Sequence, residues 1–156
     1  MASTLLNGNS SSKPFELAFP MPRAPTTHIH IQLTNSATSL LLFLTSSTTD
    51  SSGESAPMGS LVYAMPNSST PTQPLSTTLY TQSYTLDFTT RLAKLLARKL
   101  AKPVYVGNSI SFASAGMGGT VEEEMEGFRR VVEVVLGVVK KRDQEVSARE
   151  VEDVKI

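Results

Sequence analysis

Residues 27–33, Thr-His-Ile-His-Ile-Gln-Leu, alternate strictly between polar and apolar positions. Because successive side chains of a β-strand point to opposite faces, this alternation predicts a strand that is covered on one face only. A turn at 34–38 and an apolar run at 39–44 follow, and the run places apolar side chains on both faces. We therefore expect a hairpin whose second strand lies near the centre of a sheet.

Other apolar segments predict further strands. They are residues 15–22, 60–65, 75–80 and 104–112. Pro20 and Pro22 break the end of the first of these strands. Residues 45–56 and 67–74 are rich in Ser, Thr and Pro, which predicts long polar loops between the strands.

A helical period replaces the alternation between residues 85 and 101 and predicts an amphipathic helix. Its apolar face consists of Leu86, Leu92, Ala93, Leu96 and Leu100. Its opposite face carries the four cations that we call the basic stripe, namely Arg91, Lys94, Arg98 and Lys102. Pro103 ends this helix, because the residue before a proline is disfavoured in the helical conformation.

A second helix is predicted to begin after Thr120. Thr120 and Glu123 have the spacing of a capping box, Glu122–Glu124 lie at the positive end of the helix dipole, and Lys140–Arg142 lie at its negative end. One apolar stripe is expected on this helix, formed by Val121, Met125, Phe128, Val132, Val135, Leu136 and Val139. The valine-rich run 131–139, with Gly127 and Gly137, is poor helix-forming sequence, so packing would have to hold that part of the helix.

The order of elements, several strands, helix, strand, helix, predicts an α+β protein. We expect a mostly antiparallel sheet of about six strands packed with two α-helices. Residues 14–142 would form the single domain, 1–13 a disordered N-terminal arm, and 143–156 a charged, frayed tail.

Composition narrows the possible partners. The 156 residues hold 14 Lys and Arg against 14 Asp and Glu, so no overall field would attract nucleic acid or an anionic membrane. The chain has no cysteine, which excludes disulfides and thiolate metal sites. The first residues lack the features of a secretory signal, and no apolar run approaches the roughly 20 residues of a membrane span. We expect a protein of the cytoplasm, and also of the nucleus, without cofactors.

Two motifs raise the possibility of a catalytic, metal or phosphate site. His28 and His30 lie two residues apart on one strand face, where they form either a polar surface or part of a metal or acid/base site. The Gly-Met-Gly-Gly segment at 116–119 precedes a helix, as a phosphate cradle would, but it lacks the P-loop lysine and is followed by three glutamates. The glutamates at 122–126 fan around a helix, which favours a solvated acidic face over an acid/base pair. A small metal- or phosphate-dependent enzyme that uses His28 and His30 therefore remains an alternative.

The basic stripe has two interpretations. Exposed lysines and arginines keep helices soluble, and this role alone is sufficient to explain them. However, no acidic residue lies within 91–102, so ion pairs within that segment do not account for the stripe. A local basic patch on a neutral protein suits an acidic protein surface better than it suits nucleic acid.

Five segments in order resemble one protein family. Residues 96–110, Leu-Ala-Arg-Lys-Leu-Ala-Lys-Pro-Val-Tyr-Val-Gly-Asn-Ser-Ile, and residues 122–128, Glu-Glu-Glu-Met-Glu-Gly-Phe, resemble the C-terminal half of proteasome assembly chaperone 4. The segments 28–34, 61–65 and 76–80 fall in the order expected for the same family. The resemblance covers residues 26–128 and is to a fungal-type member. The chain departs from the family pattern in a longer Ser/Thr-rich loop at 45–56, a Gly-rich turn at 116–119 and an extension from Arg129.

The resemblance implies a non-enzymatic chaperone of 20S proteasome assembly. It would form a heterodimer with a chaperone 3-type paralogue and promote α-ring formation by binding α subunits, especially α5. Residues carried over as candidates for partner binding are Arg98, Lys99 and Lys102, and Glu123, Glu124, Met125, Glu126 and Phe128. Arg91 and Lys94 join them from the basic stripe. A structural subunit that stays in a larger complex is a further alternative.

Overall fold

In the described residues, a single mixed sheet packs with two helices. The computed structural model describes residues 13–50, 55–113 and 116–154. Its elements are β1 (Phe15–Met21), β2 (Ala24–Asn35), β3 (Leu40–Thr48), β4 (Ser60–Met65), β5 (Leu75–Tyr80), α1 (Ser83–Leu100), β6 (Val104–Asn108) and α2 (Val121–Val154). The sheet order is β1-β2-β3-β6-β4-β5, and every neighbouring pair is antiparallel except β3 and β6. The predicted α+β class is confirmed.

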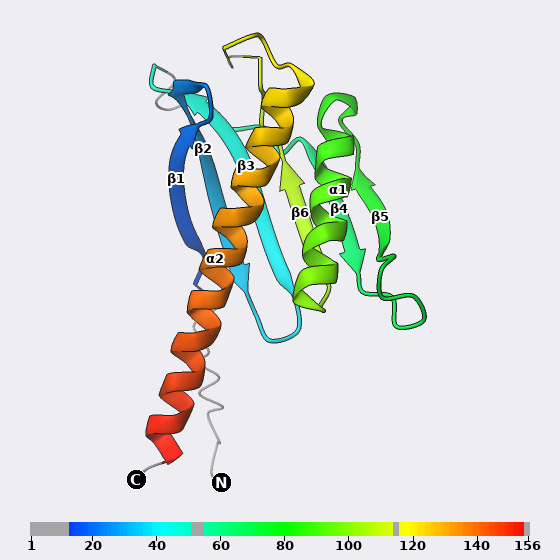
Figure 1. Ribbon diagram of the computed structural model, residues 1–156, viewed down its shortest axis with the longest axis vertical. Coiled ribbons are helices and arrows are strands. Elements are labelled where there is room, and N and C mark those ends of the chain that lie inside the picture. The colour runs from blue at the N-terminus through cyan, green and yellow to red at the C-terminus, as the bar shows by residue number, and fades with distance from the viewer. Residues whose placement is uncertain (1–12, 51–54, 114–115, 155–156) are drawn as a thin grey trace, which may run out of the picture.

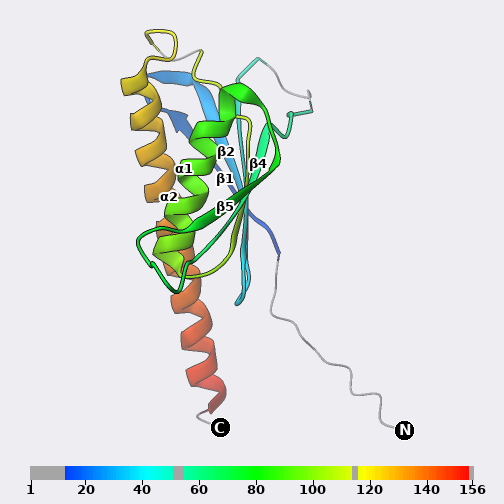
Figure 2. The ribbon, with the colours of Figure 1, turned by 90° about the vertical axis from the view of Figure 1, so that its right-hand side faces the viewer.

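Both helices lie on the same face of the sheet, and the other face carries no helix in the described residues (Figures 1 and 2). The predicted N-terminal arm falls almost wholly outside the described residues, as do positions 51–54 of the loop predicted at 45–56. The proposed domain limits therefore stay a prediction.

The hairpin of β2 and β3 follows its sequence pattern. Ile29, Ile31 and Leu33 are at most 3% exposed and face the helices, whereas His30 and Gln32 lie exposed on the other face. The polar loop after β3 begins later than predicted, because residues 45–48 continue the strand and pair with residues 27–30 of β2. The long β2 provides backbone partners for these residues, and this pairing decides their structure in spite of their polar side chains.

β6 enters the sheet between β3 and β4 and completes the core. Val106 lies opposite Leu42 on one side and Val62 on the other, and all three are fully buried beneath the helices. The strand ends at Asn108, four residues earlier than predicted.

α1 covers the β6 and β4 side of the sheet. Leu92 and Leu96 of its apolar face are fully buried, as the helical period predicted. The helix ends at Leu100, and its C-cap residue Ala101 adopts the left-handed conformation with φ of 54° and is followed two residues later by Pro103.

α2 crosses β1 and β2 and continues beyond the sheet (Figure 1). Val131, Val135 and Val139 are buried, and Val134, Val135 and Val138 pack near residues of β1 and β2, so packing holds the valine-rich run in the helix. The apolar stripe predicted for α2 is wrong at its start, because the side chains of Val121 and Met125 are 74% and 51% exposed.

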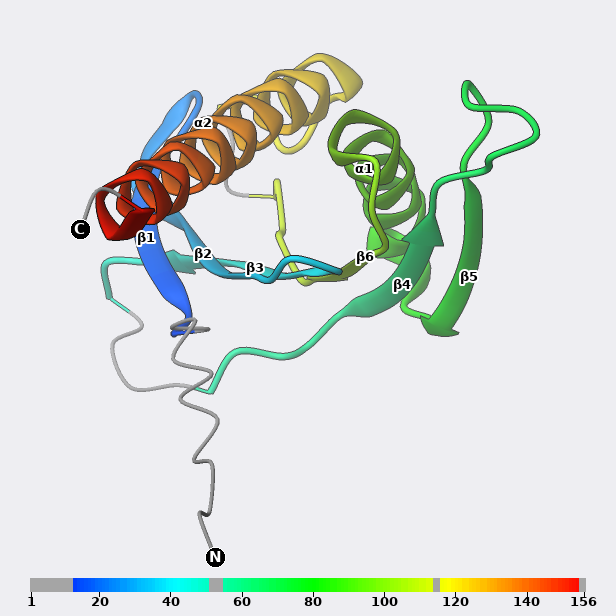
Figure 3. The same ribbon diagram turned by 90° about the horizontal axis from the view of Figure 1, so that it is seen from below.

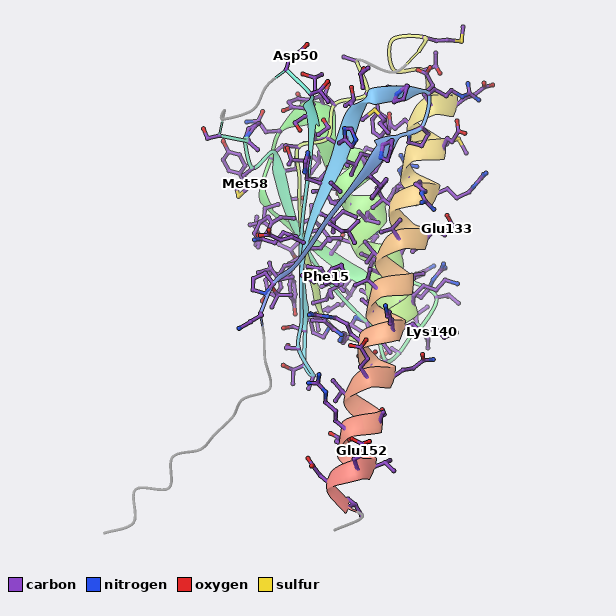
Figure 4. The ribbon with its side chains drawn as sticks, turned by 90° about the vertical axis from the view of Figure 1, so that its left-hand side faces the viewer. Phe15, Asp50, Met58, Glu133, Lys140 and Glu152 are labelled. Carbon is purple, nitrogen blue, oxygen red and sulfur yellow. The ribbon has the colours of Figure 1, made fainter. Side chains whose placement is uncertain are left out.

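The C-terminal part of α2 was also predicted incorrectly. Residues 143–154 are helical and exposed instead of forming a frayed tail, and Glu152 lies well beyond the sheet (Figure 4). This segment contains no Pro or Gly, and half of its residues are Glu, Arg, Gln or Ala, which are good helix formers. Among the described residues, neither helix is long and apolar enough to cross a membrane.

Candidate protein interaction surfaces

The basic stripe divides into paired and unpaired cations. Arg91 forms ion pairs with Asp87 at 2.9 Å and with Glu124 of α2 at 3.2 Å, and its guanidinium lies 5.2 Å from the centre of the Phe128 ring. The inference that ion pairs do not account for the stripe is therefore wrong at this position. Asp87 lies one turn before residues 91–102, and Glu124 comes from the other helix.

Lys102 makes hydrogen bonds within the protein and is therefore not a free cation of the basic stripe. Its ammonium donates hydrogen bonds to Asn35 Oδ1 and to the Ser36 carbonyl, and Asn35 Nδ2 donates to Asp143 Oδ1 of α2 at 3.1 Å. These bonds connect the end of α1, the β2–β3 turn and α2 at the point where α2 leaves the sheet. The sequence could not reveal this, because the three segments are far apart along the chain.

Lys94 and Arg98 are the stripe residues that stay exposed and without an ion-pair partner among the described residues. Together with Arg91 and the half-buried Leu95 and Phe128, they line a hollow of about 570 Å³. Its other wall is the polar loop before β5, and we call this hollow the α1 groove. Lys99 is exposed on another side of α1 and lines a separate hollow with Lys140 of α2.

Glu123 is almost fully buried, at 1% exposed, and holds the start of α2. Its carboxylate accepts hydrogen bonds from the backbone N–H groups of Met117, Gly119 and Thr120 at 2.7–3.0 Å, and the Glu123 N–H donates to Thr120 Oγ1. The predicted capping box is therefore confirmed. The predicted solvated acidic face is wrong at Glu123, which has no surface to offer a partner.

The pKa of Glu123 reflects this environment. Burial acts to raise the pKa of the carboxyl, but the three backbone donors, with the positive charge of Arg23, outweigh burial and lower it below its usual value. Glu123 is consequently an ionised, internally satisfied group.

The remaining candidates on α2 differ in exposure. Glu124 is bound to Arg91, and Glu126 forms an ion pair with Arg23 at 2.8 Å. Phe128 is half-buried in an edge-on contact with Phe88, whereas the Met125 side chain is exposed. The role of these residues in binding stays a prediction.

The structure gives the enzyme alternative little support. His30 Nε2 is 2.7 Å from Ser47 Oγ, and the described residues contain no group of three or more His, Asp or Glu side chains able to hold a metal. In the Gly-rich turn, the N–H groups of Met117 and Gly119 already bind the Glu123 carboxylate, so they are not free to bind phosphate.

The face of the sheet that carries no helix is apolar over its three central strands. We call this surface the open face and define it by Leu41, Phe43, Leu61, Tyr63, Met65 and Tyr105. Leu41, Tyr105 and Tyr63 form one row across β3, β6 and β4, and the two tyrosine rings are 4.8 Å apart. In Figure 3 the sheet lies below the two helices, and its lower face is the open face.

A glycine makes the second row of the open face continuous. Gly107 lies between Phe43 and Leu61, and a Cβ atom at this position would come within 2.6 Å of the Phe43 ring. The ring therefore occupies the space above Gly107 and extends the apolar surface towards Leu61. On the same face, β2 is polar, and its Gln32 donates a 2.9 Å hydrogen bond to Glu16 of β1.

Sequence reasoning missed the open face. The apolar composition of residues 39–44 was noted, but β4 and β6 also break the polar alternation, with Leu61, Tyr63 and Tyr105 at outward positions. Only the strand order shows that these outward residues of three distant segments lie side by side.

Comparisons with known proteins agree with this fold. A yeast chain from the structure described as a novel chaperone complex for 20S proteasome assembly is similar, with a TM-score of 0.55 and 15% sequence identity. The match covers 83% of this chain and 95% of the yeast chain, and at this identity it shows a shared fold. A search of curated protein sequences found no match.

The sequence itself also matches a family. Residues 28–110, which are more than half of the chain, match the model of the family described as proteasome assembly chaperone 4. This range ends before α2, so the resemblance noted at 122–128 lies outside it. The family is one of assembly chaperones and not a class of enzymes. The chain is therefore a member of the proteasome assembly chaperone 4 family.

Proposed function

We propose that this chain is one subunit of a heterodimeric chaperone for 20S proteasome assembly. It pairs with a chaperone 3-type paralogue and promotes formation of the α ring by binding α subunits, especially α5. It acts in the cytoplasm and the nucleus by surface complementarity, and it dissociates when later subunits cover the surface that it occupied.

The observation that carries this proposal is the open face. Antiparallel sheets that stand in water are usually polar on the solvent side, as β2 is here. The six apolar residues of the open face are aligned across three strands and include Tyr105, which is 38% exposed. A contiguous apolar surface of this kind marks an interaction site.

The paralogue is the partner that fits this surface. A chain of the same family is expected to present a sheet of its own, and two sheets pack face to face when apolar side chains interdigitate between them. Pairing through the open face leaves α1, α2 and the α1 groove on the outside of the heterodimer. These outer surfaces carry the unpaired charges that suit a reversible contact with an α subunit.

Co-expression with the paralogue tests the pairing. Tyr105→Asp places an unpaired carboxylate at the centre of the open face, and we expect it to weaken pairing by at least about 100-fold. Tyr84→Asp is the matched control, because Tyr84 is a 66% exposed tyrosine at the start of α1, away from the open face. Equal recovery of the paralogue with both variants would contradict the proposed interface.

Two further measurements test the rest of the proposal. Size-exclusion chromatography with light scattering on the chain alone distinguishes a paralogue-specific face from one that pairs with a second copy. Affinity capture from cells should recover α5 and proteasome precursors. Recovery with mature proteasomes would instead indicate a permanent structural subunit.

A further inference from the structure

The α1 groove combines positive charge with an apolar floor. Lys94 and Arg98 lie four residues apart, so their side chains are neighbours on the surface of α1. Leu95 lies between them in sequence and lines the same hollow, as does Phe128 of α2, and both side chains are partly buried against the core. A segment bound here would meet cations and apolar carbon together.

The charge in the groove is uncompensated. None of the described residues that line it is acidic, and the charge of Arg91 is already offset by Asp87 and Glu124. Lys94 and Arg98 therefore give the groove a local positive potential on a chain whose formal net charge is zero.

The opposite wall of the groove is ordered by its own hydrogen bonds. Asn67 Oδ1 accepts hydrogen bonds from the N–H groups of Ser69 and Thr70 at 3.1 and 3.3 Å, and the N–H of Gln73 donates to the Thr70 carbonyl at 2.9 Å. These local turns shape the polar loop before any partner arrives, which reduces the entropy cost of binding.

We infer that the α1 groove binds an acidic segment of a proteasome α subunit, with carboxylates on Lys94 and Arg98 and an apolar side chain on Leu95 and Phe128. This inference rests on the proposed function and identifies where and how the α subunit is held. A protein segment fits better than a nucleic acid, because Phe128, the one aromatic ring among the described residues that line the groove, already contacts Arg91 and Phe88.

A synthetic peptide tests the groove without reference to any α subunit. The probe is a fluorescent hexapeptide, Glu-Leu-Glu-Glu-Leu-Glu, titrated into the full chain and followed by anisotropy. We expect Lys94→Glu/Arg98→Glu to weaken binding by at least about tenfold and to flatten its salt dependence. Lys141→Glu/Arg149→Glu is the matched control, since it reverses one exposed Lys and one exposed Arg on α2 and should leave affinity unchanged.

Each outcome of the peptide experiment is decisive. A peptide with serine in place of leucine should bind more weakly at all salt concentrations, because it loses only the apolar contact. Absence of binding to the unmodified chain, or equal binding by both double variants, would overturn the inference. Tighter binding of a single-stranded RNA hexamer at the same residues would overturn it as well.

Binding of purified α5 to the heterodimer then separates the groove from the wider function. If the inference is correct, Lys94→Glu/Arg98→Glu loses α5 affinity while paralogue pairing is retained. If α5 binds the unmodified heterodimer and this variant equally, the groove assignment fails and the chaperone function stands. If the groove variant loses the peptide but the unmodified heterodimer does not bind α5, the identity of the bound subunit is wrong.

Discussion

The two faces of the sheet are built from the same strands but have different relations to solvent. Beneath the helices, Leu42, Val62 and Val106 are completely buried. On the open face, their neighbours Leu41, Met65 and Tyr105 are 36–39% exposed. Both sets are apolar, so composition alone does not distinguish them, and the difference lies in what covers each face.

The two faces therefore have different roles, one in the stability of the isolated chain and the other in association with a partner. Burial of the covered face stabilises the isolated chain, since apolar area removed from water contributes about 25 cal/mol per Å². The open face makes little such contribution until a partner covers it. An apolar pattern on three adjacent strands that no helix of the described residues covers is therefore best explained by binding.

Adjacent leucines of β3 provide the most direct test of the comparison, with the largest expected effect. Leu42→Ala should reduce the free energy of unfolding of the isolated chain by about 2–5 kcal/mol, because it leaves a cavity in the core. Leu41→Ala should cost less than about 1 kcal/mol in the isolated chain, where the side chain is already partly exposed. Urea unfolding measures both values, and similar losses would show that the open face is covered in the isolated chain.

The packing of α2, one of the helices that cover the sheet, can be tested at Gly127. This residue is buried in α2, and an added Cβ atom would come within 2.3 Å of the Phe112 ring. Gly127→Ala should therefore destabilise the chain by about 1–3 kcal/mol through overpacking, in spite of the better helix propensity of alanine. Thermal unfolding measures the change. A stabilised variant would mean that Phe112 can move away at little cost.

The helix-covered half of the molecule was more predictable from sequence than the proposed interaction surfaces. The alternation at 28–34 and the pair Thr120 and Glu123 each specify a local structure, so the β2 strand and the start of α2 were predicted correctly. The ion pair between Arg91 and Glu124, the hydrogen bonds of Lys102 and the rows of the open face join distant segments. Such contacts depend on the strand order, which no local pattern in this chain specifies.

The pH dependence of stability tests how the covering helix is held at its start. The pKa of Glu123 is lowered on folding, so the folded state binds fewer protons than the unfolded state. Its stabilising contribution is present above the ordinary value of 4.5 and is lost as pH falls through the lower pKa of the folded state. We expect Glu123→Gln to be less stable than the unmodified chain at pH 7, with a smaller loss than for Leu42→Ala.

Unfolding curves recorded in steps from pH 7 to pH 3 provide the control for Glu123. The difference between Glu123→Gln and the unmodified chain should shrink once the pH falls below the ordinary value of the carboxyl. Glu122→Gln is the matched variant, since Glu122 is an exposed neighbour. A difference for Glu123→Gln that stays constant over this range would show that shape, and not charge, determines the role of this side chain.

The smallest effect is expected on the outward side of α2, where Gly137 lies exposed. A Cβ atom there would meet no atom within 4 Å, in contrast to Gly127 ten residues earlier on the same helix. Gly137→Ala should stabilise the isolated chain by about 0.5–1 kcal/mol, because alanine loses less backbone entropy in a helix. Thermal unfolding measures the gain, and unchanged pairing with the paralogue provides the control. A loss of stability that grows with protein concentration would instead mean that copies of the chain contact one another through α2. In that case α2, as well as the open face, would be an interaction surface.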